Sequence, residues 1–353
     1  MSRFWSLKTH SLTPYVPGEQ PKEGVYIKLN TNENPYPPSP KAVEKIRNMD
    51  FTSLRLYPDP DGELLKKAVS DYYNISDKEV FVGNGSDEVL ALVFKAFFDE
   101  KATIAFPDIT YSFYPVYCNL FEIPFLQIPL REDLSIDLND YPTDVKGIIF
   151  ANPNAPTGLY VEPRKIEEFL KLRSDTLVIV DEAYVDFGGK SCVDLVSRYD
   201  NLLVVQTFSK SRSLAGLRIG VAVGNSALIE GIKRVKDSFN SYPVDKIAQL
   251  AGAAAIQDKE YFETVRNKII ETREKTKNIF REMGLIVTDS KANFLFVKIP
   301  GIPGPRAMEK LRQQGILVRN FNTGRISDYL RITIGTDEEM AKVVESIKVI
   351  MAE

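Results

Sequence analysis

The middle of the chain alternates short, continuously apolar runs with longer stretches in which apolar residues recur every three or four positions. Apolar runs without alternation indicate strands that are buried on both faces. The stretches between them, with an apolar residue every three or four positions, indicate helices that cover those strands. This pattern predicts an α/β fold with a mostly parallel sheet. The runs that predict its strands are residues 79–85, 102–106, 147–151, 176–181, 201–206 and 217–224.

The pattern changes toward both ends of the chain. The first 40 residues are rich in proline, which opposes helix and sheet, so we expect an extended arm there. Near residue 244 a long helical stretch begins, with a possible break at Asp258, and short strands and helices follow it. The expected organisation is an arm over 1–40 that packs with the small domain, a large domain over 41–243 and a smaller α+β domain over 244–353.

Charge and composition exclude several classes of function. The net charge is -3, so the chain lacks the basic face that nucleic-acid binding needs. His10 is the single histidine, which leaves no Ser-His-Asp triad, and we expect no metal site. Cys118 and Cys192 form no CxxC pair and are expected to be free thiols in a reducing cytoplasm. We expect no signal peptide and no membrane partner, because no apolar run approaches the roughly 20 residues of a spanning helix.

Reactive side chains follow two of the predicted strands. Asp181 and Tyr184 end the run TLVIVDEAY, and Lys210 and Arg218 lie in TFSKSRSLAGLRIG, directly after another apolar run. Each alone has an ordinary interpretation as a cap, loop or surface residue. Together they lie at the strand ends where open α/β sheets bind ligands. A lysine that binds an aldehyde, a carboxylate that keeps a ring nitrogen protonated and a phenol for the ring oxygen are what pyridoxal phosphate needs.

Two turns add candidates for ligand binding. GNGSDE (83–88) opens a predicted helix with Ser86 as N-cap, and free N–H groups there can bind a phosphate. The alternative is an ordinary capped turn, because Asp87 and Glu88 also favour a helix start. NPNAPTG (152–158) is a rigid turn whose asparagine either donates to a ligand or is purely structural.

Taken together, these motifs resemble those of fold-type I, aspartate-aminotransferase-like enzymes (class II pyridoxal-phosphate-dependent aminotransferases), and among them the histidinol-phosphate branch. The resemblance implies a fold-type I transferase, a homodimer and pyridoxal 5'-phosphate as cofactor. It also implies amino transfer between glutamate/2-oxoglutarate and imidazole acetol phosphate/histidinol phosphate. Further motifs that carry it are LTPY, LNTNENPYP, LYPD, PDITYSFY, ILVRNF and YLRITIGT.

The resemblance also implies roles for individual residues. Lys210 would hold the cofactor and move the substrate proton, Asp181 would pair with the ring nitrogen, and Tyr184 would contact the ring oxygen. Tyr57 would reach the site of a second subunit. The other cofactor contacts would be Ser86, Asp87, Tyr111, Asn154, Thr207, Ser209 and Arg218, and the substrate contacts Tyr15, Asn32, Tyr57, Arg319 and Arg331.

Two positions depart from the family pattern. Ala155 stands where many relatives carry asparagine, so either Asn154 replaces that residue by a local shift or Tyr184 alone serves the ring oxygen. Arg212 stands where relatives often carry an aromatic residue. Two rival activities stay open, an aromatic amino acid aminotransferase and a pyridoxal-phosphate-dependent decarboxylase of a phosphorylated amino acid. A non-catalytic sensor joined to a DNA-binding module is disfavoured, because the chain has no basic helix.

Overall fold

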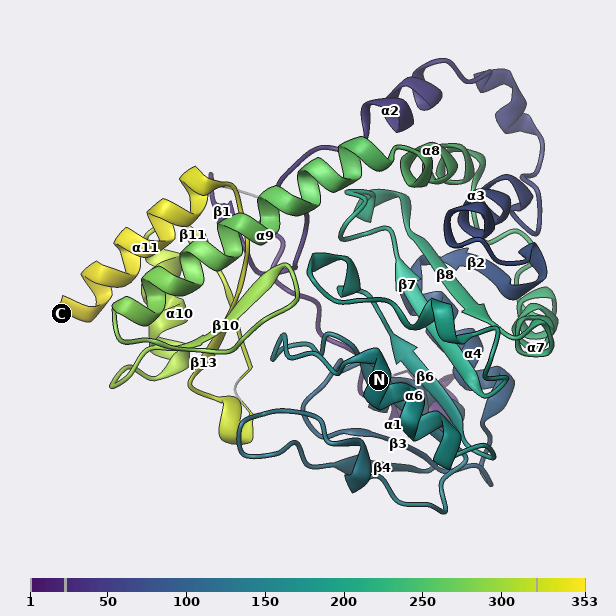
Figure 1. Cartoon of the computed structure of the whole chain (residues 1–353), viewed down its shortest axis with the longest axis horizontal. Coiled ribbons are helices and arrows are strands. Elements are labelled where there is room, and N and C mark those ends of the chain that lie inside the picture. The colour runs from purple at the N-terminus through teal and green to yellow at the C-terminus, as the bar shows by residue number, and fades with distance from the viewer. Residues whose placement is uncertain (1, 22–23, 322, 353) are drawn as a thin grey trace.

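The computed structural model describes residues 2–21, 24–321 and 323–352, and most of them surround one large sheet (Figure 1). The strands of this sheet are β2 (Val80–Asn84), β3 (Ile104–Pro107), β4 (Phe125–Ile128), β5 (Gly147–Ala151), β6 (Leu177–Asp181), β7 (Leu202–Thr207) and β8 (Ile219–Gly224). Their order is β2-β8-β7-β6-β5-β3-β4. Strands β4, β3, β5, β6 and β7 run parallel, and β8 is antiparallel to both of its neighbours. The prediction of a mostly parallel sheet is confirmed.

Helices cover both faces of this sheet because successive residues of its strands point to opposite sides. Ile149 and Ile179 pack with α4 and α5, whereas Ile148 and Val178 pack with α6. The continuous apolar runs in the sequence reflect this burial on both faces. The helices of this part are α2 (Pro40–Arg47), α3 (Glu63–Tyr73), α4 (Gly85–Phe97), α5 (Tyr114–Phe121), α6 (Pro163–Leu172), α7 (Ser226–Asp237) and α8 (Lys246–Gln257).

A second, smaller part contains an antiparallel sheet of order β12-β13-β10-β9. The long helix α9 leads from the helices of the large sheet to this part, where α10 and α11 also pack (Figure 1). The elements are α9 (Lys259–Glu282), β9 (Ile286–Val287), β10 (Phe294–Lys298), α10 (Gly304–Gln313), β11 (Ile316–Leu317), β12 (Arg319–Asn320), β13 (Tyr329–Thr333) and α11 (Asp337–Ala352).

The N-terminal arm connects to the small part through backbone hydrogen bonds. The arm contains the short helix α1 (Leu7–Ser11), and its strand β1 (Ile27–Lys28) pairs in parallel with β11. Leu29 continues this pairing, donating to the carbonyl of Leu317 and accepting from the amide of Thr333. Asn32, three residues on, donates its backbone amide to Thr333 of the small part and its side-chain amide to Tyr184 of the large part, so this segment is held between the two parts of the molecule.

Helix α8 packs on the large part. Its Ala248 and Ala251 share a core cluster with Leu65 and Val69 of α3. The predicted break at Asp258 is present between α8 and α9, and the Asp258 carboxylate accepts a hydrogen bond from Ser39 at 2.5 Å. The expected domain boundary at residue 243 stays a prediction, and the packing of α8 favours a boundary nearer Asp258.

Three of the element boundaries that differ from the predictions lie next to predicted site residues. Helix α4 begins at Gly85 with Asn84 as N-cap, so Ser86 is not the cap and its hydroxyl is free for other contacts. Strand β8 begins at Ile219 rather than 217, because Arg218 has a left-handed φ of 50°. The predicted strand 316–321 splits into β11 and β12, which pair with different strands.

Short 3-10 helices join several elements: η1 (Phe51–Arg55), η2 (Asp77–Glu79), η3 (Leu138–Asp140), η4 (Val185–Phe187), η5 (Cys192–Leu195), η6 (Ala215–Leu217) and η7 (Gly324–Ile326). Over the described ranges, every helix is too short or too polar to cross a bilayer.

Candidate active site

A cavity of 810 Å³ lies where the large sheet, the small part and the N-terminal arm meet. Most of the residues singled out from the sequence line it. They are Tyr15, Asn32, Ser86, Asp87, Tyr111, Asp181, Tyr184, Thr207, Ser209, Lys210, Arg218, Arg319 and Arg331.

Sheet topology explains why distant sequence motifs gather here. Parallel β6 and β7 end at Asp181 and Thr207, so both carboxyl ends lie at one edge of the sheet. Strand β8 is antiparallel to β7, so its beginning, next to Arg218, lies at the same edge. Strand β2 in turn is antiparallel to β8, which brings its end and the start of α4 beside Arg218.

Asp181 is a buried carboxylate with a small set of partners. It is 4% exposed, accepts a hydrogen bond from the Tyr114 hydroxyl at 2.9 Å and accepts another from the Ala183 amide at 3.2 Å. Burial raises the pKa of Asp181 to about 6, and these hydrogen bonds oppose the rise. A cationic partner in the cavity would therefore stabilise its charged form.

The side-chain amine of Lys210 is less basic than that of an exposed lysine. Its Nζ donates to the Thr31 carbonyl at 3.0 Å and lies 6.0 Å from the centre of the Tyr184 ring. Burial, assisted by the positive charge of Arg331, lowers the pKa of Lys210 to about 8, while Glu33 acts in the opposite direction. Such an amine is more readily available as a nucleophile than an exposed lysine.

Polar and charged groups converge at the start of α4. Arg218 Nη2 lies 2.9 Å from Asp87 Oδ2, and its Nη1 lies 3.4 Å from the Ser209 hydroxyl. Tyr111 donates its hydroxyl to Asp87 Oδ1 at 2.7 Å. The Thr207 hydroxyl donates to the Ile219 carbonyl and accepts from the Ser209 amide, which shapes the turn before Lys210. This end of the cavity offers an arginine, hydroxyls and a helix N-terminus, the groups that bind phosphate.

The opposite end of the cavity contains two arginines of the small part. Arg331 Nη2 donates to the Asn30 carbonyl at 3.0 Å, and its buried Nε has no hydrogen-bond partner among the described residues. Arg319 donates to the carbonyls of the arm at Val16 and Pro17, at 3.3 and 3.5 Å. An anion would supply the acceptor that Arg331 lacks.

Tyr184 and Asn32 form one further contact inside the cavity. The Asn32 side-chain amide donates to the Tyr184 hydroxyl at 2.9 Å. Asn32 has a φ of 57° and is 1% exposed, so its orientation is tightly held. Tyr15 approaches from the arm, and its ring contacts that of Phe113 in a tilted arrangement, with centroids 4.5 Å apart.

Two of the predicted site residues lie outside the cavity. The side chain of Asn154 is engaged by the loop after β3, where it accepts from the Thr110 hydroxyl at 2.8 Å and donates to the Ile109 carbonyl at 2.9 Å, while Ala155 lines the cavity. Tyr57 is 80% exposed on the surface of the large part.

Arg212, for which the sequence suggests no role, also lies away from the cavity. Its guanidinium carbon sits 3.5 Å from the centre of the Phe262 ring and 5.1 Å from that of Tyr72. It therefore packs between aromatic side chains rather than facing a ligand.

The sequence profile of the family Aminotransferase class I and II matches residues 25–347. A histidinol-phosphate aminotransferase of Clostridium acetobutylicum is 53% identical over 348 residues, which cover 99% of each chain. The chain belongs to the histidinol-phosphate aminotransferase family. Another relative with that name, from Pseudomonas syringae pv. syringae, is 53% identical over 98% of this chain and 99% of its own.

Solved structures share the fold. The histidinol-phosphate aminotransferase of Sinorhizobium meliloti, solved in complex with pyridoxal-5'-phosphate, has a TM-score of 0.89 and 23% identity over 99% of both chains. The family resemblance and the fold-type I class predicted from the motifs are both confirmed.

Sequence reasoning did not single out three residues that bond or influence the residues of the cavity. Tyr114 bonds Asp181, yet in the sequence it is one aromatic residue among several in PDITYSFY. The Thr31 carbonyl bonds Lys210 through its backbone, which no residue pattern reveals. Glu33 pairs with Lys28 and influences Lys210, and its place in LNTNENPYP is the one signal for it.

Proposed function

We propose that this chain is a pyridoxal-phosphate-dependent transaminase acting between glutamate and imidazole acetol phosphate. Its products would be 2-oxoglutarate and L-histidinol phosphate, in histidine biosynthesis. The observation that carries the proposal is the 53% identity with a histidinol-phosphate aminotransferase over 99% of both chains. The cavity adds independent chemical support.

The residues of the cavity fit pyridoxal phosphate. When bound, this cofactor supplies an aldehyde that condenses with amines and a protonated ring that accepts negative charge from the substrate carbon. Lys210 has a lowered pKa of about 8, as an amine that binds an aldehyde requires. Asp181 is the buried carboxylate for the ring nitrogen, and Arg218 with Ser86 and Ser209 forms an anion site at one end of the cavity.

The proposed roles follow from charge and position. Lys210 would hold the cofactor, and its Nζ would accept and return the proton of the substrate carbon. Asp181 keeps the ring nitrogen protonated, and Tyr114 orients its carboxylate by a hydrogen bond of 2.9 Å. Tyr184, oriented by Asn32, contacts the ring oxygen. The side chain of Asn154 is engaged by Ile109 and Thr110, which favours Tyr184 as the group at the ring oxygen.

The remaining cofactor contacts are of two kinds, those with the ring and those with the phosphate. Tyr111 stacks on the ring. Its hydrogen bond to Asp87 orients it, and the same carboxylate positions Arg218. Ser86, Ser209 and Arg218 hold the cofactor phosphate, and Thr207 shapes the turn that presents Ser209.

Substrate recognition is assigned to the far end of the cavity. Arg331 binds the substrate carboxylate or phosphate through the guanidinium whose Nε has no protein partner in the described chain. Arg319 adds a second positive charge beside it, and Tyr15 with Asn32 lines the imidazole side. One arginine fork can serve both half-reactions, because carboxylate and phosphate present similar paired acceptors.

We further propose a homodimer in which Tyr57 contacts the substrate phosphate in the partner subunit's cavity. Tyr57 is 80% exposed, and exposed apolar side chains precede it, with Phe51 at 54%, Leu54 at 48% and Leu56 at 53%. Such an apolar surface suits an isologous contact with a second copy of the chain. The buried thiols of Cys118 and Cys192, each without a disulfide, support a location in a reducing cytoplasm.

A half-reaction screen tests the proposed activity. The purified holoenzyme is mixed with single amino donors, and the visible band of the cofactor is followed by stopped flow. Glutamate and histidinol phosphate are expected to convert the band rapidly, and aromatic amino acids slowly. Faster conversion by phenylalanine or tyrosine would favour the aromatic rival. Release of carbon dioxide from a phosphorylated amino acid would favour the decarboxylase.

A further inference from the structure

Lys236, in the last turn of α7, is an almost fully buried lysine that does not line the cavity described above. Its side chain is 2% exposed, and its Nζ donates to the carbonyls of Pro60 at 2.9 Å and Ser241 at 3.5 Å. Carboxylate oxygens of Asp237 and Asp61 lie 2.8 and 3.5 Å from the same nitrogen. A buried ammonium is costly without such partners, so the segments that supply them are held together.

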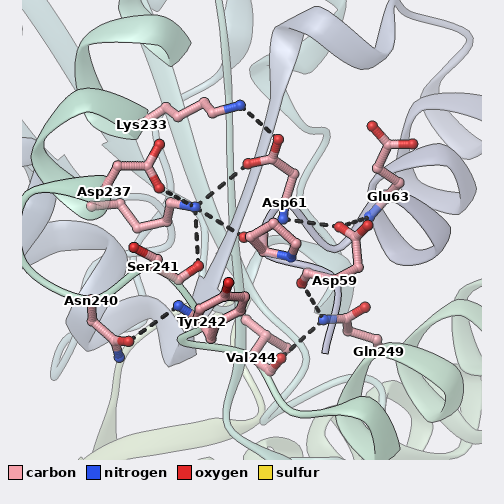
Figure 2. Close-up of polar contacts among 12 residues, drawn as sticks. Asp59, Asp61, Glu63, Lys233, Asp237, Asn240, Ser241, Tyr242, Val244 and Gln249 are labelled. Atoms are coloured by element: carbon pink, nitrogen blue, oxygen red, sulfur yellow. Dashed lines mark hydrogen bonds and ion pairs between the residues drawn. The ribbon is translucent and has the colours of Figure 1, made fainter. Parts of the chain in front are cut away.

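These partners come from two segments that each carry a tyrosine. Pro60 belongs to the loop 57–62, which begins with Tyr57, and Ser241 directly precedes Tyr242. The two tyrosine rings are stacked, with centroids 4.7 Å apart and planes 18° apart. Lys236 therefore links the backbone of the segment that carries Tyr57 to the backbone of the segment that carries Tyr242. The contacts of the buried amine with Asp61, Asp237 and Ser241 are drawn as dashed lines in Figure 2.

A second buried side chain holds the same loop from α8. The Gln249 side-chain amide donates to the carbonyls of Asp59 and Val244, each at 2.9 Å, and Gln249 is 5% exposed (Figure 2). The Asp59 carboxylate in turn accepts from the amides of Asp61 and Glu63 at 2.9 and 3.2 Å, at the start of α3. The backbone of the loop is thus fixed at Asp59 and at Pro60, two and three residues after Tyr57.

We propose that Lys236 and Gln249 are positioning residues that hold the Tyr57 ring in the orientation needed to reach substrate in the partner subunit. The proposal rests on the function proposed above, in which Tyr57 contacts the substrate phosphate. Neither residue lines the cavity of its own chain. Their effect is therefore confined to the substrate that Tyr57 touches, and the reaction with glutamate does not depend on them.

The test compares the two half-reactions of the holoenzyme. Stopped-flow kcat/KM values are measured with histidinol phosphate and with glutamate for Lys236→Met, Gln249→Leu and Tyr57→Phe, and for Lys236→Met combined with Tyr57→Phe. Lys233→Met is the matched control, because Lys233 also pairs with Asp61, at 2.6 Å, but its side chain is 41% exposed. Exposed pairs contribute little. Hydrogen exchange of residues 56–62 reports on the loop itself.

Tyr57→Phe removes a hydrogen bond to a charged group, so it should lower kcat/KM for histidinol phosphate roughly 10- to 150-fold. Lys236→Met and Gln249→Leu should produce part of that loss, speed exchange in residues 56–62 and leave the glutamate reaction within about twofold. The combined variant should be no worse than Tyr57→Phe, since residues that act through one contact are not additive. Lys233→Met should match the unmodified protein.

Other outcomes overturn the proposal. Equal losses for both substrates would mean that Lys236 and Gln249 serve stability alone. Tyr57→Phe could lower kcat/KM for histidinol phosphate alone while Lys236→Met and Gln249→Leu leave both reactions unchanged. That result would exclude the positioning role and leave the proposed function intact. If Tyr57→Phe itself shows no selectivity, the assumed phosphate contact fails, and the positioning role fails with it. If Lys236→Met does not fold, the kcat/KM values of Gln249→Leu and its hydrogen exchange in residues 56–62 test the positioning role.

Discussion

Asp181 is a single carboxylate whose charge depends on what lies beside it. Burial raises its pKa to about 6, so a cationic ring nitrogen is the partner that would keep it ionised at neutral pH. Asp181→Asn is nearly isosteric but cannot act as the counter-ion. We expect this variant to retain cofactor and to lose several orders of magnitude in single-turnover rate with glutamate. Tyr114→Phe removes one hydrogen bond to this carboxylate but leaves its charge, so it is the control and should lose far less than Asp181→Asn, at most roughly 10- to 150-fold. A loss below about tenfold, or about 1.4 kcal/mol, in Asp181→Asn would contradict the ion pair.

The basicity of Lys210 can be measured through cofactor uptake. Because burial and the Arg331 charge lower its pKa to about 8, covalent incorporation of pyridoxal phosphate into the cofactor-free protein should accelerate as pH rises through about 8. Above that pH the amine is neutral and nucleophilic, and below it the amine is protonated. Glu33→Gln removes a charge that raises this pKa, so its midpoint should move to lower pH, and Arg331→Leu should move it to higher pH. A midpoint near that of an exposed lysine, about 10.4, would contradict the burial effect.

At the scale of elements, the contact between β8 and the start of α4 shapes the proposed phosphate site. A Cβ added to Gly220 of β8 would lie 2.4 Å from the backbone nitrogen of Ser86, so Gly220→Ala must displace that turn. Overpacking of this kind costs about 1–3 kcal/mol, which corresponds to roughly 5- to 150-fold in cofactor affinity if it falls on the site. Spectral titration of the cofactor-free protein would measure the affinity. Gly216→Ala is the control, because a Cβ there meets no atom within 4 Å. Equal affinities in the two variants would show that the β8 contact does not shape the site.

At the scale of the whole molecule, the proposed dimer makes one site depend on two chains. Lys210→Ala removes the reactive amine from its own cavity, whereas Tyr57→Ala would impair the cavity of the partner subunit. Mixing the two variants under conditions that exchange subunits should raise activity with histidinol phosphate above that of either variant alone, since each hybrid dimer has one intact site. Light scattering or sedimentation would confirm that hybrids form. Confirmed hybrids without activity would place Tyr57 in the cavity of its own chain or outside any cavity.

Much of this protein can be predicted from the order of residues alone. Continuous apolar runs predicted six of the seven strands of the large sheet, because a strand buried on both faces admits few polar side chains. The strand they did not predict is β4, a partly exposed strand at the edge of the sheet. The motifs around Asp181, Lys210 and Arg218 indicated the site, because strand ends and glycine turns are local features. The break at Asp258 was visible for the same reason.

Tertiary structure decided what depends on residues far apart in the chain. The Thr31 carbonyl beside Lys210, the Tyr114 hydroxyl on Asp181 and the packing of Arg212 on Phe262 all arise from contacts that local patterns do not encode. The lowered pKa of Lys210 has the same origin, since it depends on burial and on charges brought in from the arm and the small part. The sequence by itself determined which elements form and which chemistry their ends carry. Only the folded chain decided which backbone and side-chain groups surround that chemistry, because burial and electrostatic contacts depend on distance in space.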